Sequence, residues 1–222
     1  MTSSTAKTVG GSVLGTARNA IADVLHRSAG GERDERVVAG VCSLAPEAPR
    51  SMLDVGCSDG RVASRIAKLL GISDVRGADV ELQPDAQIPV TEYDGSDLPF
   101  DDGTFDLVTI VDVLHHADDP IAVLRSSLRV LRPGGRLVIK DHVRLGRWSN
   151  GVLLAMDEAS NFGVHARTAG RYLSPAEWVN HATIAGGHIE TMVWPFRVHS
   201  LPWRLVARSE YHLLLRVRQE PA

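Results

Sequence analysis

The sequence predicts a single α/β domain with a mostly parallel, doubly wound sheet and helices on both of its faces. From Ser51 onward, short apolar runs alternate with segments of helical periodicity, which is typical of a parallel sheet. The nearly continuous apolar run from Phe105 to Leu114 is typical of a central strand covered on both faces. A chain of 222 residues, 44% of them hydrophobic and 23% charged, suits one globular domain with a substantial core.

The strands follow from apolar runs bounded by turn residues. Residues 81–88 leave too little chain between the second and third strands for a full crossover helix. The last two strands follow the final helix. We expect strands, in chain order, at about 51–56, 74–80, 89–93, 105–114, 137–143, 188–194 and 210–218.

The helices are predicted from their apolar periodicity and their end signals. Asp119 is expected to cap a helix that begins at Pro120 and keeps Leu131 on its apolar face, before Pro133-Gly134-Gly135 ends it. Ser174 and Glu177 have the spacing of a capping box, which opens a helix that stops at Gly186. Further helices are expected at about 14–28, 32–44 and 60–70.

Composition and charge exclude several classes of partner. A formal net charge of −3 gives no basic surplus to attract nucleic acid or an anionic membrane, so we expect neither as a partner. Cys42 and Cys57 are too few for a disulfide framework and lack metal-site spacing, which favours a cytoplasmic protein. The first eleven residues lack the apolar core of a secretory signal, and no apolar run is long enough to span a membrane.

Polar residues follow four successive predicted strands, at Asp54–Gly60, Asp79, Asp94–Gly95 and Asp112–Asp119. Ligands of open parallel sheets bind outside the carboxyl ends of the strands, so these loops should meet at one crevice. Asp79 lies 79 − 54 = 25 residues after Asp54, close to the spacing of about 20 residues for an acid that binds ribose hydroxyls.

The glycine loop distinguishes between two cofactor classes. A nicotinamide dinucleotide loop requires a third glycine at the position that Arg61 occupies, so its pattern is missing. Asp54-x-Gly56-x-Ser58-x-Gly60 instead resembles the first motif of the class I S-adenosylmethionine-dependent methyltransferases. The resemblance extends to Asp141, and the ordered set of motifs is similar to that of the branch that includes the ubiquinone and menaquinone biosynthesis methyltransferases. Its further motifs are Gly77-Ala78-Asp79-Val80, Asp94-Gly95-Ser96-Asp97-Leu98-Pro99-Phe100, Asp112-Val113-Leu114-His115-His116 and Leu131-Arg132-Pro133-Gly134-Gly135.

The resemblance implies a Rossmann-like sheet of seven strands, the last antiparallel, and S-adenosylmethionine as the cofactor. It implies that the loop around Gly56 holds the methionine part and that Asp79 holds the ribose. It places Asp94 and Gly95 at the adenine and Asp112 beside the methionyl amine. The implied cofactor-binding residues are Asp54, Gly56, Cys57, Ser58, Gly60, Asp79, Val80, Asp94, Gly95 and Asp112. Ser58 departs from the usual middle glycine, and Cys57 is expected to be a small filler rather than a nucleophile.

His116, Asp141 and His142 are the candidate catalytic residues, because they end strands at the edge where an acceptor should lie. A histidine of the His115-His116 pair could act as a base or could only bond to the backbone. Asp141 could touch the substrate or could pair with an arginine. We expect no metal, because adjacent histidines point different ways and acids at a helix start are explained by capping.

These residues predict methyl transfer to a small-molecule acceptor by in-line displacement. Residues 1–48 are expected to form an N-terminal tail and helices that cap the site, and residues 49–222 the methyltransferase domain. An insertion at 144–172 would close over the acceptor, with Trp148, Leu153, Leu154 and Met156 as its apolar underside or as ordinary core. Its polar residues are Asp157, Glu158, Asn161, His165, Arg167 and Tyr172. The alternatives are a non-methylating protein of the same fold, and a methyltransferase acting on RNA or protein, for which Arg216 and Arg218 could contribute to a basic patch. The oligomeric state and the acceptor stay open.

Overall fold

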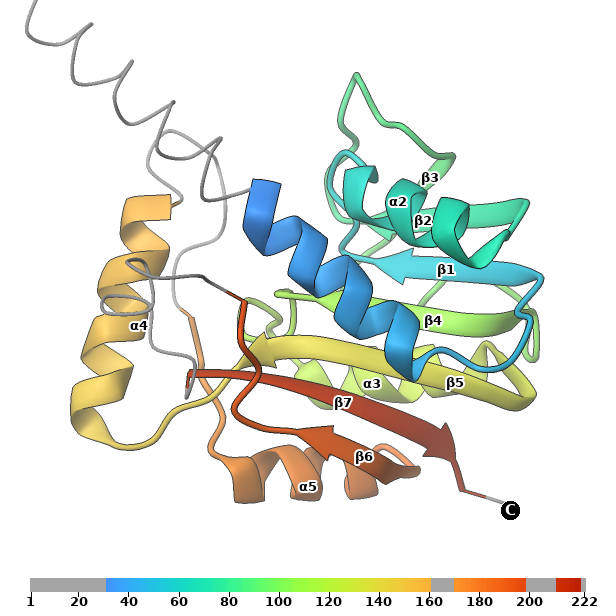
Figure 1. Ribbon diagram of the computed structural model, residues 1–222. Coiled ribbons are helices and arrows are strands. Elements are labelled where there is room, and N and C mark those ends of the chain that lie inside the picture. The colour runs from blue at the N-terminus through green and yellow to red at the C-terminus, as the bar shows by residue number, and fades with distance from the viewer. Residues whose placement is uncertain (1–30, 161–169, 199–210, 221–222) are drawn as a thin grey trace, which may run out of the picture.

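The computed structural model describes residues 31–160, 170–198 and 211–220, with the side chains of 156–160 left aside. A helix at 31–44 precedes the sheet, and the sheet alternates with helices up to the last two strands (Figure 1). The strands are β1 (Ser51–Val55), β2 (Asp74–Asp79), β3 (Val90–Glu92), β4 (Phe105–Val111), β5 (Leu131–His142), β6 (Gly187–Val193) and β7 (His212–Gln219). The labelled helices are α2 (Arg61–Leu70), α3 (Pro120–Arg129), α4 (Arg147–Ser160) and α5 (Pro175–Ile184).

The seven strands form one sheet in the order β3-β2-β1-β4-β5-β7-β6. β7 pairs antiparallel with both β5 and β6, whereas the pairs among β1 to β5 are parallel. This topology confirms the predicted doubly wound sheet with an antiparallel last strand. The strand order reverses between β1 and β4, and the carboxyl ends of these two strands therefore flank the switch point where ligands of such sheets bind.

Helices cover both faces of the sheet, as the alternating sequence pattern predicts (Figure 1). On one face, Val37, Val38 and Val41 of the helix at 31–44 pack with Ala63 and Ile66 of α2. On the other face, α3 and α5 contribute to a larger buried cluster that includes Leu124 and Trp178. Both capping signals are confirmed: Asp119 accepts the N–H groups of residues 121 and 122, and Ser174 and Glu177 form a complete capping box.

The structure corrects two details of the predicted helices. α3 ends at Arg129, and Leu131 instead begins β5, where it pairs with Phe105. Leu131 is buried in either case, so its apolar character could not distinguish helix from strand. Leu69, which the apolar periodicity of the helix at 60–70 predicts to point inward, is instead 68% exposed. The expected helix at 14–28 lies outside the described residues.

The segment between β2 and β3 contains no helix, as its length predicts. Among the described residues, no helix is both long and apolar enough to cross a membrane.

Candidate active site

The glycine loop connects β1 to α2 through left-handed backbone. Gly56, Ser58 and Gly60 have φ values of 70°, 50° and 70°. A Cβ on Gly56 would lie 2.3 Å from Val113 Cγ2, so only glycine lets the loop pack against the turn after β4. Ser58 takes up a conformation that usually favours glycine, and its N–H donates to Asp79 Oδ2 at 2.7 Å. The loop is therefore tied to the ends of both neighbouring strands.

The acids after β2 and β3 border an exposed apolar surface. Asp79 also accepts the N–H of Glu81, whereas Asp94 Oδ1 accepts three hydrogen bonds from its own turn. The N–H groups of Asp97 and Ser96 lower the pKa of Asp94, so this carboxylate stays ionised. Val80 is 55% exposed and lies beside Gly95, where an added Cβ would be 3.4 Å from its Cγ1.

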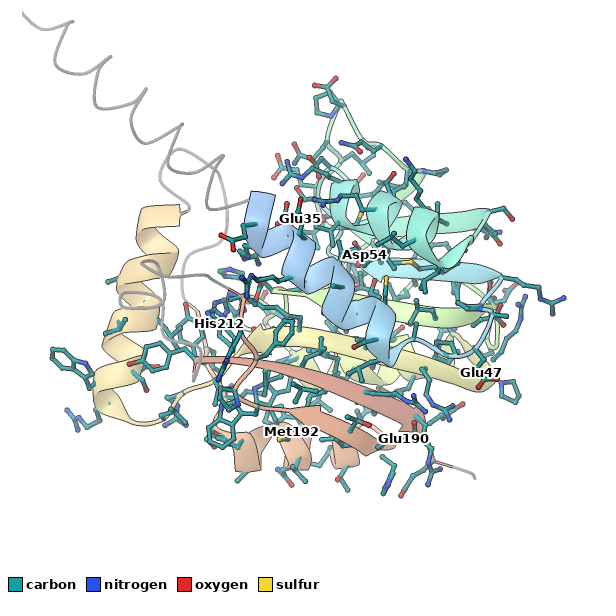
Figure 2. The ribbon with its side chains drawn as sticks, viewed as in Figure 1. Glu35, Glu47, Asp54, Glu190, Met192 and His212 are labelled. Carbon is teal, nitrogen blue, oxygen red and sulfur yellow. The ribbon has the colours of Figure 1, made fainter. Side chains whose placement is uncertain are left out.

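Asp54 and Cys57 are buried beneath the loop. Asp54 sits on β1 and accepts a hydrogen bond from Thr109 Oγ1 at 2.5 Å (Figure 2). Burial raises the pKa of Asp54 to about 7, partly offset by the Thr109 hydroxyl. Burial and the charge of Asp54 raise the pKa of the Cys57 thiol to about 12, which makes it a poor nucleophile.

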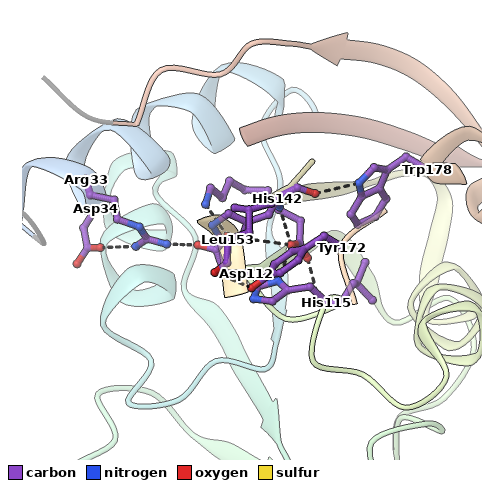
Figure 3. Close-up of polar contacts among 11 residues, drawn as sticks. Arg33, Asp34, Asp112, His115, His142, Leu153, Tyr172 and Trp178 are labelled. Carbon is purple, nitrogen blue, oxygen red and sulfur yellow. Dashed lines mark hydrogen bonds and ion pairs between the residues drawn. The ribbon is translucent and has the colours of Figure 1, made fainter. Parts of the chain in front are cut away.

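Asp112 directly follows β4 and lies at the centre of a buried group of charges (Figure 3). It accepts a hydrogen bond from Lys140 Nζ at 2.5 Å and another from Arg33 Nη2, and it lies 3.3 Å from His142 Nδ1. Burial alone would raise the pKa of Asp112, but the charges of Lys140 and Arg33 hold it well below its usual range. Burial lowers the pKa of Lys140, whose side chain is fully enclosed.

Asp141 pairs with His115, a partner that the sequence pattern did not indicate. Its Oδ1 lies 2.6 Å from His115 Nδ1, and its Oδ2 accepts the N–H of Leu114 at 3.0 Å. Burial opposes ionisation of Asp141, but the His115 charge and hydrogen bond lower its pKa. Among the described residues, the closest side-chain partner of Asp141 is therefore His115, and its contact with a substrate stays a prediction.

Aromatic and imidazole rings surround this pair. The ring of His115 stacks on Tyr172 at a centroid distance of 5.3 Å and lies 4.0 Å from His116. His142 lies 4.8 Å from both His115 and His212, again between centroids. Burial, followed by the charge of Lys140, lowers the pKa of His142, which favours a neutral imidazole. The predicted His116, Asp141 and His142 thus lie together, and the structure adds His115 to them.

Sequence reasoning did not single out Arg33, Lys140 or His212 as site residues. Lys140 and His142 are two residues apart on β5, so their side chains lie on the same face of the strand. The predicted role of His142 was therefore the available signal for Lys140. His212 pairs with His142 only because β7 runs antiparallel and begins at this edge. Arg33 comes from a helix that is 79 residues away in the chain, and no local pattern indicates its contact.

In the segment after β5, one residue of the predicted apolar underside, Leu153, is buried. Leu153 of α4 is buried with Tyr172 and Tyr211, and Tyr172 donates its hydroxyl to the Leu153 carbonyl. Trp148 is 81% exposed and Leu154 is 40% exposed, so neither packs inward as expected. The remaining predicted residues of this segment, namely Met156, Asp157, Glu158, Asn161, His165 and Arg167, lie outside the described side chains.

His115, Asp141 and His142 place one ligand atom each within 4.8 Å of one another, which is close enough for a metal ion. Two features disfavour a cation there. Both oxygens of Asp141 already accept hydrogen bonds, and Asp112, the next carboxylate, carries the Lys140 ammonium. A metal would therefore meet a fixed positive charge, and the lack of a metal stays a prediction.

A family model described as a methyltransferase domain matches residues 53–139, from β1 to the middle of β5. The chain carries a class I methyltransferase domain. The matched residues hold the glycine loop, Asp79, Asp94 and Asp112, whereas Lys140, Asp141 and His142 lie just beyond them.

The chain is similar to curated enzymes that are named for different acceptors, and it spans about half the length of most of them. A 27-O-demethylrifamycin SV methyltransferase of Amycolatopsis mediterranei is 33% identical over 158 residues, which cover 60% of this chain and 57% of that protein. A ubiquinone biosynthesis O-methyltransferase of Xanthomonas oryzae pv. oryzae is 28% identical over 180 residues, 71% of this chain and 69% of that one. The predicted resemblance to the ubiquinone branch is thereby confirmed.

The fold of this chain also resembles that of a protein named for other chemistry. The crystal structure of the 4+2 cyclase SpnF matches with a TM-score of 0.62 and 18% identity, covering 84% of this chain and 82% of that one. At this identity the likeness concerns the fold alone.

Proposed function

We propose that this chain transfers the methyl group of S-adenosylmethionine to a small-molecule acceptor. The observation that supports this most strongly is that a surface suited to the cofactor and a buried polar cluster lie at the same edge of the sheet. The loop at Gly56–Gly60 is bonded to Asp79, and the exposed apolar side chain of Val80 follows, which suits an adenosine. The buried polar cluster at Asp112 and Asp141 lies at the ends of the neighbouring strands. The cofactor-binding assignment is Asp54, Gly56, Cys57, Ser58, Gly60, Asp79, Val80, Asp94, Gly95 and Asp112.

S-adenosylmethionine, when bound, supplies a methyl group on a positively charged sulfur. The protein then has to align the acceptor and exclude water, and proximity alone can contribute about 7 to 11 kcal/mol. When the His115 ring is neutral and its Nδ1–H donates to Asp141, the basic nitrogen of the ring is Nε2. We assign His115 as the group that takes the proton of an acceptor hydroxyl or ammonium, and Asp141 as the residue that positions it.

His116 and His142 are assigned to the acceptor side, where they orient the substrate. The helix at 31–44 and the segment 144–172 form its cap in this proposal, as part of an N-terminal unit at 1–48 and a methyltransferase domain at 49–222. Tyr172 supports this assignment, because its ring stacks on His115 while its hydroxyl is bonded to α4. The cap would exclude water from the reacting atoms.

Calorimetric titration with S-adenosylhomocysteine tests the cofactor assignment. Asp79→Ala is expected to weaken binding by tenfold or more, because it removes the carboxylate at the predicted ribose position. Asp74→Ala is the matched control: it lies at the other end of β2 and pairs with Arg76. The proposal fails if the unaltered protein binds neither S-adenosylmethionine nor S-adenosylhomocysteine at submillimolar concentration.

A non-methylating enzyme is the second candidate, because the cyclase SpnF has a similar fold and is named for other chemistry. Incubation with S-adenosylmethionine labelled at the methyl group distinguishes the two. Transfer of label to a panel of phenols, alcohols and amines supports methylation, whereas tight cofactor binding with no transfer to any acceptor favours the second candidate.

An RNA or protein acceptor has less support. Arg136 and Arg216 donate to Glu190, and Arg218 lies 3.6 Å from it, so this carboxylate offsets part of their charge. Glu190 lies toward the opposite end of the sheet from His212 (Figure 2). These arginines are therefore far from the proposed site of transfer.

A further inference from the structure

Three arginines from two neighbouring strands converge on one carboxylate, away from the candidate active site. Arg136 Nε of β5 donates to Glu190 Oε2 at 2.6 Å, and Arg216 Nε of β7 donates to the same oxygen at 2.8 Å. Arg218 Nε, also of β7, lies 3.6 Å from Glu190 Oε1. Glu190 belongs to β6 and lies toward the opposite end of the sheet from His212 (Figure 2). The cluster is therefore separate from the residues assigned to the cofactor and the acceptor.

The strand register places these side chains on one face of the sheet. Continuing the antiparallel register of β5 and β7 by one residue places Arg136 across from Arg218, and Arg216 is two residues before Arg218. His188 of β6 pairs with Arg218 and adds an imidazole to the same face. The N-terminal helix packs on this face over β5, but it does not reach β6 (Figure 1). The cluster thus lies on an uncovered corner of the sheet.

The three guanidinium groups carry more positive charge than one carboxylate can neutralise. Burial opposes ionisation of Glu190, but the hydrogen bonds from Arg216 and Arg136 lower its pKa, so it supplies one negative charge. Like charges at facing positions of neighbouring strands destabilise a sheet. Two positive charges therefore lack a counter-charge within this cluster.

Arg216 and Arg218 can reach a second anion. They keep 31% and 35% of their side chains exposed, and within the part of the chain that the structure describes, Glu190 is the acid that both contact. Both approach Glu190 through Nε, so donors on their terminal nitrogens remain for another partner.

We propose that this cluster binds a dianionic phosphate group at a site separate from that of methyl transfer. A phosphate monoester carries about 1.5 to 2 negative charges at neutral pH and three acceptor oxygens, which matches the charge that Glu190 leaves uncompensated. Planar guanidinium groups bind phosphate through pairs of parallel hydrogen bonds. Because the arginines converge on one point, a compact dianion fits them better than an acidic protein segment, whose charges are spread along the chain.

Calorimetric titration of the full chain with inorganic phosphate, at constant ionic strength, tests the site. Arg216→Gln and Arg218→Gln should each weaken phosphate binding fivefold or more, because each removes a charged donor group. Arg36→Gln is the matched control: it also removes an exposed arginine that is paired with a glutamate, Glu32, and it should leave the affinity unchanged. Phenyl phosphate is titrated in parallel: tighter binding than inorganic phosphate supports a phosphate monoester as the ligand, and equal binding supports recognition of the phosphate group alone.

Glu190→Gln distinguishes a phosphate site from a purely structural cluster. The variant removes the competing anion, so it should bind phosphate several-fold more tightly than the unaltered protein. Phosphate should also raise its midpoint of urea denaturation more than that of Arg36→Gln, since a ligand stabilises the folded state that binds it. The same denaturation in chloride shows whether each variant folds.

The proposal is overturned if phosphate binds neither the unaltered protein nor Glu190→Gln. It is also overturned if the affinity for phosphate is the same in Arg216→Gln as in the unaltered protein, because the cluster would then only hold the three strands together. Tighter binding of an oligoglutamate peptide than of phosphate would overturn it in favour of an acidic protein partner.

Discussion

The free energy of unfolding of an Asp54→Asn variant, compared with that of the unaltered protein, should increase as the pH rises. The folded state raises the pKa of Asp54 from 3.8 to about 7, so it holds this proton more tightly than the unfolded state does. The stability that Asp54 contributes is therefore fully present below about pH 4 and is lost as the pH rises toward 7. A neutral asparagine of similar shape removes this dependence.

The shift of about three pKa units corresponds to about 4 kcal/mol, at 1.36 kcal/mol per unit. Of this, about 3 kcal/mol falls between pH 5 and pH 8, because some of the loss has already occurred at pH 5. An asparagine amide that lacks a partner adds a cost, but this cost is the same at every pH. The informative quantity is therefore the change with pH in the stability difference between the two proteins.

Urea denaturation at pH 5, 6, 7 and 8 measures this difference. The free energy of unfolding of Asp54→Asn minus that of the unaltered protein should rise by about 3 kcal/mol across the range. Asp106→Asn is the control: burial opposes ionisation there, but hydrogen bonds from Arg50, Ser51 and Arg132 lower the pKa of Asp106, so its difference should not rise. A difference for Asp54→Asn that stays constant between pH 5 and pH 8 would refute the reasoning.

Three further predictions concern single contacts. Gly56→Ala should destabilise the fold by about 1 to 3 kcal/mol in urea denaturation, because a Cβ would collide with Val113 and the φ is positive; a variant as stable as the parent would contradict the packing described. Asp119→Ala should cost about 1 kcal/mol by the same measurement, through loss of the α3 cap, and leave the affinity for S-adenosylhomocysteine unchanged. Asp141→Asn should lower the methyl-transfer rate on a hydroxyl acceptor by about 10²-fold or more, since it weakens the orientation of His115, while cofactor affinity stays within twofold; a normal rate would remove His115 from its proposed role.

Local signals were enough to predict most of the fold. The alternation of apolar runs and helical segments predicts the parallel sheet, because a strand buried on both faces needs a continuous apolar run such as 105–114. Asp119 and Ser174 predict their helix starts because a cap acts within a few residues of the chain. The predicted end of α3 was wrong. Leu131 is buried in β5 and would also be buried at the end of a helix, so its apolar character did not distinguish the two.

The sequence by itself also determined that acids follow the strands at one sheet edge, because parallel strands present their carboxyl ends together. Only the tertiary structure decided which of them meet. His115 and His116 are adjacent in one turn, and it is the position of Asp141 on β5 that selects His115. Arg33 reaches Asp112 from a helix packed across the sheet, and His212 joins the site because β7 runs antiparallel. These contacts depend on long-range packing and strand direction, which no local spacing of residues encodes.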